Sequence, residues 1–110
     1  MGHPAIQAGR TAVITGGASG IGYAVAQKLI AVGMNVVIAD RDQRALKEAA
    51  NQLGENALAV LTDVANLSDV EALRDTVLSR FGEVAVLMNN AGTGGGGGAF
   101  GSYKGWQKVL

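Results

Sequence analysis

The stretch Thr15–Gly22, which reads TGGASGIG, decides the fold of this chain. An apolar run of strand length at residues 11–15 leads into it, and apolar residues at helical spacing follow it. We interpret it as a strand–turn–helix junction in which Gly16 allows the tight turn, Gly20 the close approach of a ligand and Gly22 the packing of helix on strand. Free N–H groups and the dipole of the helix N-terminus would favour an anion there.

Strand and helix patterns keep alternating after this junction. Apolar runs at residues 35–39, 57–61 and 84–88 predict three further buried strands. The first helix between strands has an apolar stripe at Ile21, Val25, Leu29 and Val32 and is expected to end at Gly33. Continuous apolar strands separated by amphipathic helices are typical of a parallel sheet covered on both faces. We therefore predict an α/β fold with three αβα layers, Rossmann-like, with strand order 3-2-1-4.

Capping signals mark the ends of the next two helices. Asp42 is placed to cap the second helix, which Gly54 ends. Ser68 and Glu71 form an S-x-x-E capping box for the third, which is expected to end at Gly82. The apolar faces are Leu46, Ala49, Ala50 and Leu53 in the second helix and Val70, Leu73, Val77 and Phe81 in the third.

Length and composition bound the class of protein. We assign residues 1–110 to a single domain, with residues 1–10 as an N-terminal tail and residues 93–102 as a glycine-rich loop around five consecutive glycines. The formal net charge is zero, which gives no sign of a nucleic-acid or membrane partner. The chain has no cysteine, no apolar run of membrane-spanning length and no signal-peptide pattern, so a cytoplasmic location is expected.

An acidic residue follows the second predicted strand, 18 residues after Gly22. The carboxylate of Asp40 could accept both ribose hydroxyls of an adenosine and would repel a 2′-phosphate. Its neighbour Arg41 could instead hold that phosphate, but position 19 in the turn is the uncharged Ser19. The sequence therefore favours NAD over NADP as cofactor.

Four motifs, each at the end of a predicted strand, together resemble the short-chain dehydrogenase/reductase family. They are TGxxxGIG at residues 15–22, Asp40, Asp63-Val64 and NNAG at residues 89–92. The resemblance runs over residues 11–110 and implies hydride transfer between a nicotinamide cofactor and an alcohol or ketone substrate. It also implies that the complete enzyme forms a homo-oligomer.

The resemblance further implies which residues bind the cofactor. Asp63 would meet the adenine amino group, Val64 would lie along the ring, and Asn89 would tie the fourth strand to its neighbours. The expected cofactor-binding residues are Gly16, Ser19, Gly20, Ile21, Gly22, Asp40, Arg41, Asp63, Val64, Asn90, Ala91 and Gly92. They follow the carboxyl ends of strands, where open α/β sheets bind their ligands.

The family's catalytic Ser, Tyr-x-x-x-Lys and helix Asn have no match in this sequence, so no catalytic residue and no metal ligand is assigned. Tyr103 and Lys104 are adjacent and would point about 100° apart on a helix, so they are interpreted as surface residues. Trp106 resembles the Trp that opens the family's next helix. We therefore expect the N-terminal, cofactor-binding portion of a longer enzyme, inactive as the 110-residue chain.

Two other classes of function stay open at this point. The chain could be a catalytically inactive module for dinucleotide binding or assembly. It could also be a methyltransferase, which places an acidic residue at the end of the second strand as well, although the turn spacing and the NNAG segment argue against this.

Overall fold

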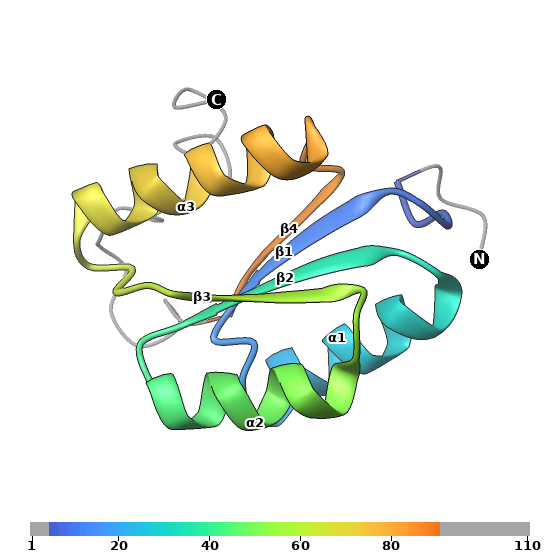
Figure 1. Ribbon diagram of the computed structural model, residues 1–110, viewed down its shortest axis with the longest axis horizontal. Helices are drawn as coiled ribbons and strands as arrows, with labels where there is room; N and C mark the ends of the chain where they lie inside the picture. Colours follow the sequence, from blue (N-terminus) through green and yellow to red (C-terminus); the bar gives the residue numbers. More distant parts are fainter. Residues whose placement is uncertain (1–4, 91–110) are drawn as a thin grey trace.

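The computed structural model describes residues 5–90. Its elements follow the predicted alternation of strand and helix (Figure 1): β1 (Thr11–Thr15), α1 (Gly20–Val32), β2 (Asn35–Asp40), α2 (Gln43–Leu53), β3 (Ala57–Leu61), α3 (Leu67–Phe81) and β4 (Val86–Asn89). The strands pair in parallel in the order β3-β2-β1-β4. This confirms the predicted fold class and strand order.

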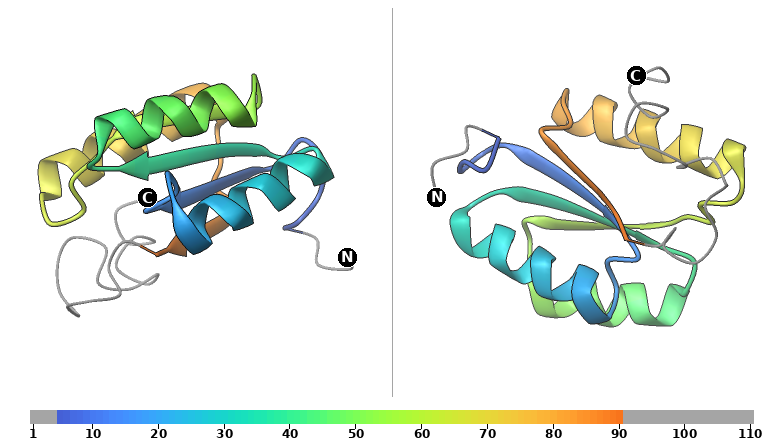
Figure 2. Two further views of the ribbon diagram at one scale, coloured as in Figure 1. Left: turned by 90° about the horizontal axis from the view of Figure 1, so that it is seen from below. Right: turned by 180° about the vertical axis from the view of Figure 1, so that it is seen from behind.

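The helices divide between the two faces of the sheet. In the three ribbon views, α1 and α2 lie together on one face and α3 lies on the other (Figures 1 and 2). Ile14 and Ile38 belong to the fully buried core beneath α1 and α2, whereas Val13 and Val37 face α3. The alternation of neighbouring residues between two cores explains why the strands are apolar throughout.

The α1 stripe differs in part from the prediction. The buried residues of α1 are Gly22, Ala26 and Leu29, and Ile21 is 70% exposed. Gly22 and Ala26 are small, so the helix can lie close to the sheet at these positions. The prediction followed the larger apolar residues and therefore placed Ile21 on the buried face, where it does not lie. The stop at Gly33 is confirmed, because this residue caps α1 in the left-handed conformation.

The predicted Ser68–Glu71 capping box is wrong. The helix α3 begins at Leu67, and the side chain of Asn66 caps it by accepting a hydrogen bond from the Asp69 N–H at 3.2 Å. Asparagine caps helices as well as serine does. Because α3 already begins at Leu67, the cap position is Asn66, and Ser68 lies inside the helix. The other end of α3, at Gly82, is as predicted, and so are the Asp42 and Gly54 caps of α2.

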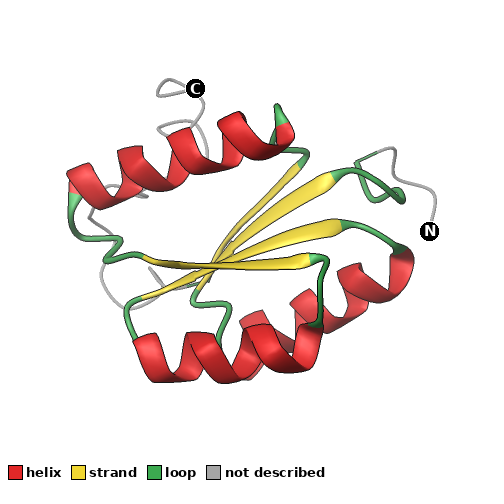
Figure 3. Cartoon of the chain, viewed as in Figure 1, coloured by secondary structure: helices red, strands yellow, loops and turns green. Residues whose placement is uncertain are grey.

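The fourth strand is shifted by one to two residues from the predicted range 84–88. It runs Val86–Asn89, although the Ala85 N–H already donates to the Thr11 carbonyl at 2.8 Å. Figure 3 shows where each described strand and helix ends and the connecting loop begins. None of the described helices is long and apolar enough to cross a membrane.

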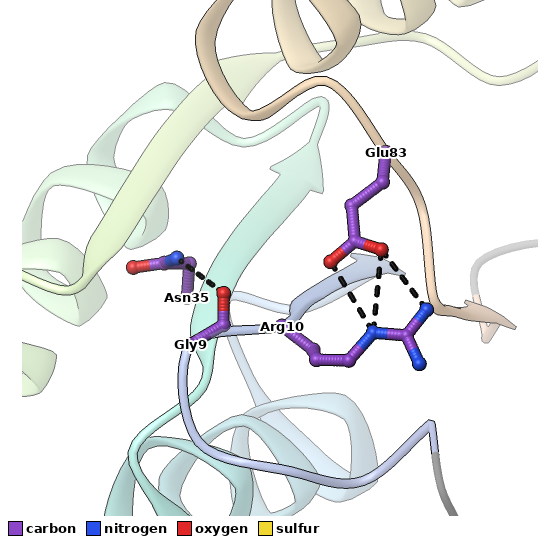
Figure 4. Close-up of polar contacts among 4 residues, drawn as sticks. All are labelled: Gly9, Arg10, Asn35 and Glu83. Atoms are coloured by element: carbon purple, nitrogen blue, oxygen red, sulfur yellow. Dashed lines mark hydrogen bonds and ion pairs between the residues drawn. The ribbon is translucent and has the colours of Figure 1, made fainter.

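The segment before β1 contacts the amino edge of the sheet. Ile6 packs against the α1–α2 core, and the Gly9 carbonyl accepts from Asn35 Nδ2 at 3.3 Å (Figure 4). Arg10 forms an ion pair with Glu83, with Nη2 2.9 Å from Oε1. The hydrogen bond from Arg10 holds the pKa of Glu83 below its ordinary value. These contacts join the start of the described chain to the core, to the start of β2 and, through Glu83, to the loop before β4, at the edge opposite the strand carboxyl ends.

Candidate functional site

A hollow opens where the parallel strands end. Its volume is about 540 Å³, within the usual range for small-molecule sites. It is lined by Gly16, Ser19, Gly20, Asp40, Arg41, Thr62, Asp63, Val64, Ala65 and Asn90. The site predictions from four separate motifs therefore meet in one place, the carboxyl edge of the sheet.

The glycine turn forms the wall nearest β1. Gly16 has φ +66°, and its N–H donates to the Ala39 carbonyl at 2.7 Å, so the turn is fixed onto β2. Gly20 has φ +59°, and a Cβ placed on it would meet nothing within 4 Å. The backbone at Gly20 is therefore open toward the hollow, as close approach of a ligand requires.

The two remaining glycines of the turn are needed for packing. A Cβ on Gly22 would lie 2.3 Å from the Gly16 carbonyl oxygen and 3.1 Å from Asn90 Nδ2, so this position lets the turn fold back over the start of α1. A Cβ on Gly17 would lie 2.7 Å from Ile38 Cγ2 on β2. Gly22 thus packs the start of α1 against the residues that follow β1 and β4, as predicted, and Gly17, to which no role was assigned from the sequence, makes a further close contact with β2.

The N-terminus of α1 points its N–H groups at this turn without a side-chain cap. Ser19 has the extended backbone of a cap residue, but its side chain makes no capping hydrogen bond in the described structure. The first turn of α1 also contains no acidic residue. The N–H groups of the first turn therefore have no side-chain acceptor among the described residues. Such N–H groups, together with the helix dipole, favour an anion in the hollow.

The carboxylate of Asp40 spans the space between this turn and α2. Its Oδ2 accepts from the Ala18 N–H at 3.3 Å, and its Oδ1 accepts from the Asp42 N–H at 3.1 Å. Both bonds orient a half-buried carboxylate at the mouth of the hollow. Arg41 is exposed beside it and lines the same hollow.

The loop between β3 and α3 forms the far wall. Thr62 is buried and its N–H donates to the Asp40 carbonyl at 2.8 Å, which joins this wall to β2. Asp63 is exposed, and its Oδ1 accepts from the Ala65 N–H at 2.9 Å. Val64 is half-buried against the α3 core. Thr62 and Ala65 were not predicted as site residues, because the resemblance pointed only to the Asp-Val pair between them.

The end of β4 supports the turn from below. Asn90 Nδ2 donates to the Gly16 carbonyl at 3.3 Å, and Thr15 Oγ1 donates to Asn89 Oδ1 at 3.0 Å. Asn89 thus ties β4 to β1. Asn90 lines the hollow, whereas the exposed Ile21 does not, and Gly22 lies beneath the turn.

Several predicted residues lie outside the described part of the chain. They are Ala91, Gly92, Tyr103, Lys104 and Trp106, together with the glycine-rich loop. Within residues 5–90 there is no group of three or more side chains that could hold a metal ion.

Comparison with known proteins gives this geometry a family. The family model described as short chain dehydrogenase matches residues 10–110. The chain belongs to this family. An oxidoreductase of Mycobacterium bovis is 48% identical over 85 residues, which cover 76% of this chain and 34% of that protein. The 3beta-hydroxysteroid dehydrogenase 2 of Eggerthella lenta is 40% identical over 93 residues, covering 82% of this chain and 36% of that protein.

Solved structures of short-chain dehydrogenases superpose on the same region. A short-chain dehydrogenase/reductase of Burkholderia phymatum in complex with NAD has 43% identity and a TM-score of 0.70, covering 73% of this chain and 30% of that one. The 3-ketoacyl-(acyl-carrier-protein) reductase of Brucella melitensis complexed with NADH has 40% identity and a TM-score of 0.70, covering 73% and 33%. Our chain spans about a third of the length of its relatives. Membership of this family decides against the methyltransferase interpretation.

Proposed function

We propose that this chain binds NAD and supplies the dinucleotide-binding part of an oxidoreductase that interconverts an alcohol and a ketone. The observation that carries the proposal is the uncapped N-terminus of α1, which opens into a hollow with the Asp40 carboxylate across from it. A free helix N-terminus binds phosphate, and a carboxylate in this position binds ribose hydroxyls. The NAD and NADH complexes of the two solved relatives support the same cofactor class.

The residues of the hollow fit the parts of a dinucleotide. Gly16, Ser19 and Gly20 would hold the pyrophosphate, because all three line the hollow, the backbone at Gly20 is open and Ser19 leaves the helix N–H groups free. Asp40 would accept from the ribose hydroxyls. Asp63 would meet the adenine, whose ring would lie along Val64. Asn90 and the family-implied Ala91 and Gly92 would line the adenosine ribose side. Ile21 and Gly22 would contribute through the backbone of the first helical turn.

The preference for NAD over NADP rests on charge. A 2′-phosphate would have to lie beside the Asp40 carboxylate, which is held in place by two backbone N–H groups. Ser19 offers no positive charge on the turn side, and Arg41 is the one cation among the residues that line the described hollow. We infer that the carboxylate dominates, because it is oriented toward the site whereas Arg41 is exposed.

When bound, the nicotinamide would accept or give a hydride at its ring while the substrate carbinol carbon is oxidised or the ketone reduced. In this family that chemistry needs a Tyr-x-x-x-Lys pair, which the 110-residue chain does not contain. We therefore propose one cofactor-binding domain that is catalytically silent by itself. Homo-oligomer formation by the complete enzyme and a cytoplasmic location stay predictions.

The experiment is a calorimetric titration of the chain and of Asp40→Ala with NAD and with NADP. We expect the wild type to prefer NAD, and the variant to lose about tenfold in NAD affinity, about 1.4 kcal/mol, while discriminating less against NADP. Asp75→Ala, which removes an exposed carboxylate from α3, is the matched charge control. Tighter binding of NADP than of NAD by the wild type would refute the assignment.

A further inference from the structure

The loop between β3 and α3 is more firmly fixed than its exposure suggests. The Asp63 carbonyl accepts from the Asn66 N–H at 2.9 Å, and Asp63 Oδ1 accepts from the Ala65 N–H at 2.9 Å. These two bonds make residues 63–66 a closed turn. Both bonds lie within the turn, so neither of them attaches it to the rest of the site.

The attachment comes from the first turn of α3. Asp69 Oδ2 accepts from the Asp63 N–H at 2.9 Å. In an ordinary capping box, the third residue of the helix reaches back to the N–H of the cap residue. Here the N–H of the cap residue Asn66 is already used by the Asp63 carbonyl, so the Asp69 carboxylate extends instead to Asp63.

This contact determines where the Asp63 side chain can act. The backbone of Asp63 is held from both sides, by Asp69 at its N–H and by Asn66 at its carbonyl. Ala65 occupies Oδ1, and among the described residues Oδ2 has no hydrogen-bond partner. Asp63 therefore presents one oriented acceptor oxygen at the rim of the hollow.

We propose that Asp69 is a positioning residue for recognition of the base, an inference that rests on the proposed function. An oriented acceptor at Asp63 selects a base with an amino group at position 6, which is adenine, over hypoxanthine, which carries a carbonyl oxygen there. Asp69 itself does not line the hollow. It sets the selectivity by holding the backbone of Asp63 through a charge-assisted hydrogen bond.

The test compares AMP with IMP as ligands of the full chain, using chemical-shift titrations of ¹⁵N-labelled protein. Wild type is expected to prefer AMP. In Asp69→Ala the ratio of AMP to IMP affinity should fall about threefold to tenfold, the size of one lost hydrogen bond. Asp69→Asn keeps an acceptor oxygen and should retain most of the ratio. Glu71→Ala removes an exposed carboxylate two residues along α3, for which the described structure shows no hydrogen bond, and should change nothing.

The ratio separates positioning from stability. A purely structural loss would weaken AMP and IMP alike and leave their ratio unchanged. An unchanged ratio in a folded Asp69→Ala, with AMP still bound by wild type, would overturn this inference and leave the proposed function standing. Absence of AMP binding by wild type would instead overturn the proposed function, and this inference with it.

Discussion

Helices α1 and α3 both begin at the carboxyl edge of the sheet, but their terminal N–H groups have different partners. In α3, Asn66 caps the helix and Asp69 adds a carboxylate to the first turn. In α1, Ser19 makes no cap bond and the first turn contains no acidic residue. Four N–H groups at a helix start need acceptors. The chain supplies a side-chain acceptor at the start of α3, whereas the start of α1 has none in the described structure and its N–H groups are left for a ligand.

The difference follows from what each loop has to do. The α3 loop carries Asp63, an acceptor that needs a fixed backbone, and its side chains are used to hold that backbone. The α1 turn presents backbone donors, so it is built of glycines and small residues that keep side chains out of the way. The α3 loop thus uses its side chains for hydrogen bonds within the loop, whereas the side chains of the α1 turn leave the N–H groups of the helix start without a cap in the described chain.

The largest expected effect comes from filling the open wall. Gly20→Val places a branched side chain where Gly20 now faces free space, so NAD affinity should fall about a hundredfold, the equivalent of about 2.7 kcal/mol. The chain should stay folded at a backbone strain of about 1–2 kcal/mol, because the new Cβ would meet no other part of the described fold within 4 Å. Calorimetric titration with NAD, together with circular dichroism, measures both quantities.

A second glycine provides the control for backbone strain. Gly82 also has a positive φ, +78°, and a Cβ added to it would meet nothing within 4 Å, but it caps the far end of α3. Gly82→Val should carry a similar strain, about 1–2 kcal/mol, and bind NAD normally. Unchanged NAD affinity in a folded Gly20→Val would remove the turn from the site.

The next prediction gives α1 the kind of start that α3 has. Ser19→Asp supplies a carboxylate at a residue that already has the extended backbone of a cap, with φ −155°. It should stabilise the free chain by about 0.5–1 kcal/mol and weaken NAD binding about tenfold, because the carboxylate competes with the phosphates for the same N–H groups. Urea unfolding and NAD titration measure the two changes.

Ser19→Asn separates capping from charge. Its uncharged side chain should cap nearly as well as Asp and cost less NAD affinity. A more stable Ser19→Asp with undiminished NAD affinity would show that the phosphates are bound elsewhere than at the start of α1.

The fold was predictable because it depends on local patterns. Runs such as Val36-Val37-Ile38 are long enough to be strands and too apolar for a solvent-facing element. Helix stops were equally local, since Gly33 and Gly82 adopt left-handed conformations that other residues avoid. Strand order then followed from the handedness of parallel connections.

The details that escaped prediction depend on partners distant in the chain. Gly17 must be a glycine because of Ile38, a neighbour that only the pairing of β1 with β2 brings close. The cap of α3 was assigned to Ser68 because S-x-x-E is a strong local pattern, whereas the actual contacts run from Asp69 through Asn66 to Asp63. A sequence pattern can rank candidate cap residues. Which of them caps the helix depends on which acceptor reaches each N–H group in the folded chain.

The smallest expected effect tests the two helix starts directly. Asn66→Ala removes the oxygen that accepts from the Asp69 N–H, so the free energy of unfolding should fall by about 1 kcal/mol. Ser19→Ala, the same change at the start of α1, should cost much less, because the Ser19 side chain makes no cap bond in the described structure. Urea unfolding of both variants measures the difference, as a shift in midpoint at constant slope. Equal losses would mean that Ser19 caps α1 in solution, and the N–H groups there would no longer be free for an anion.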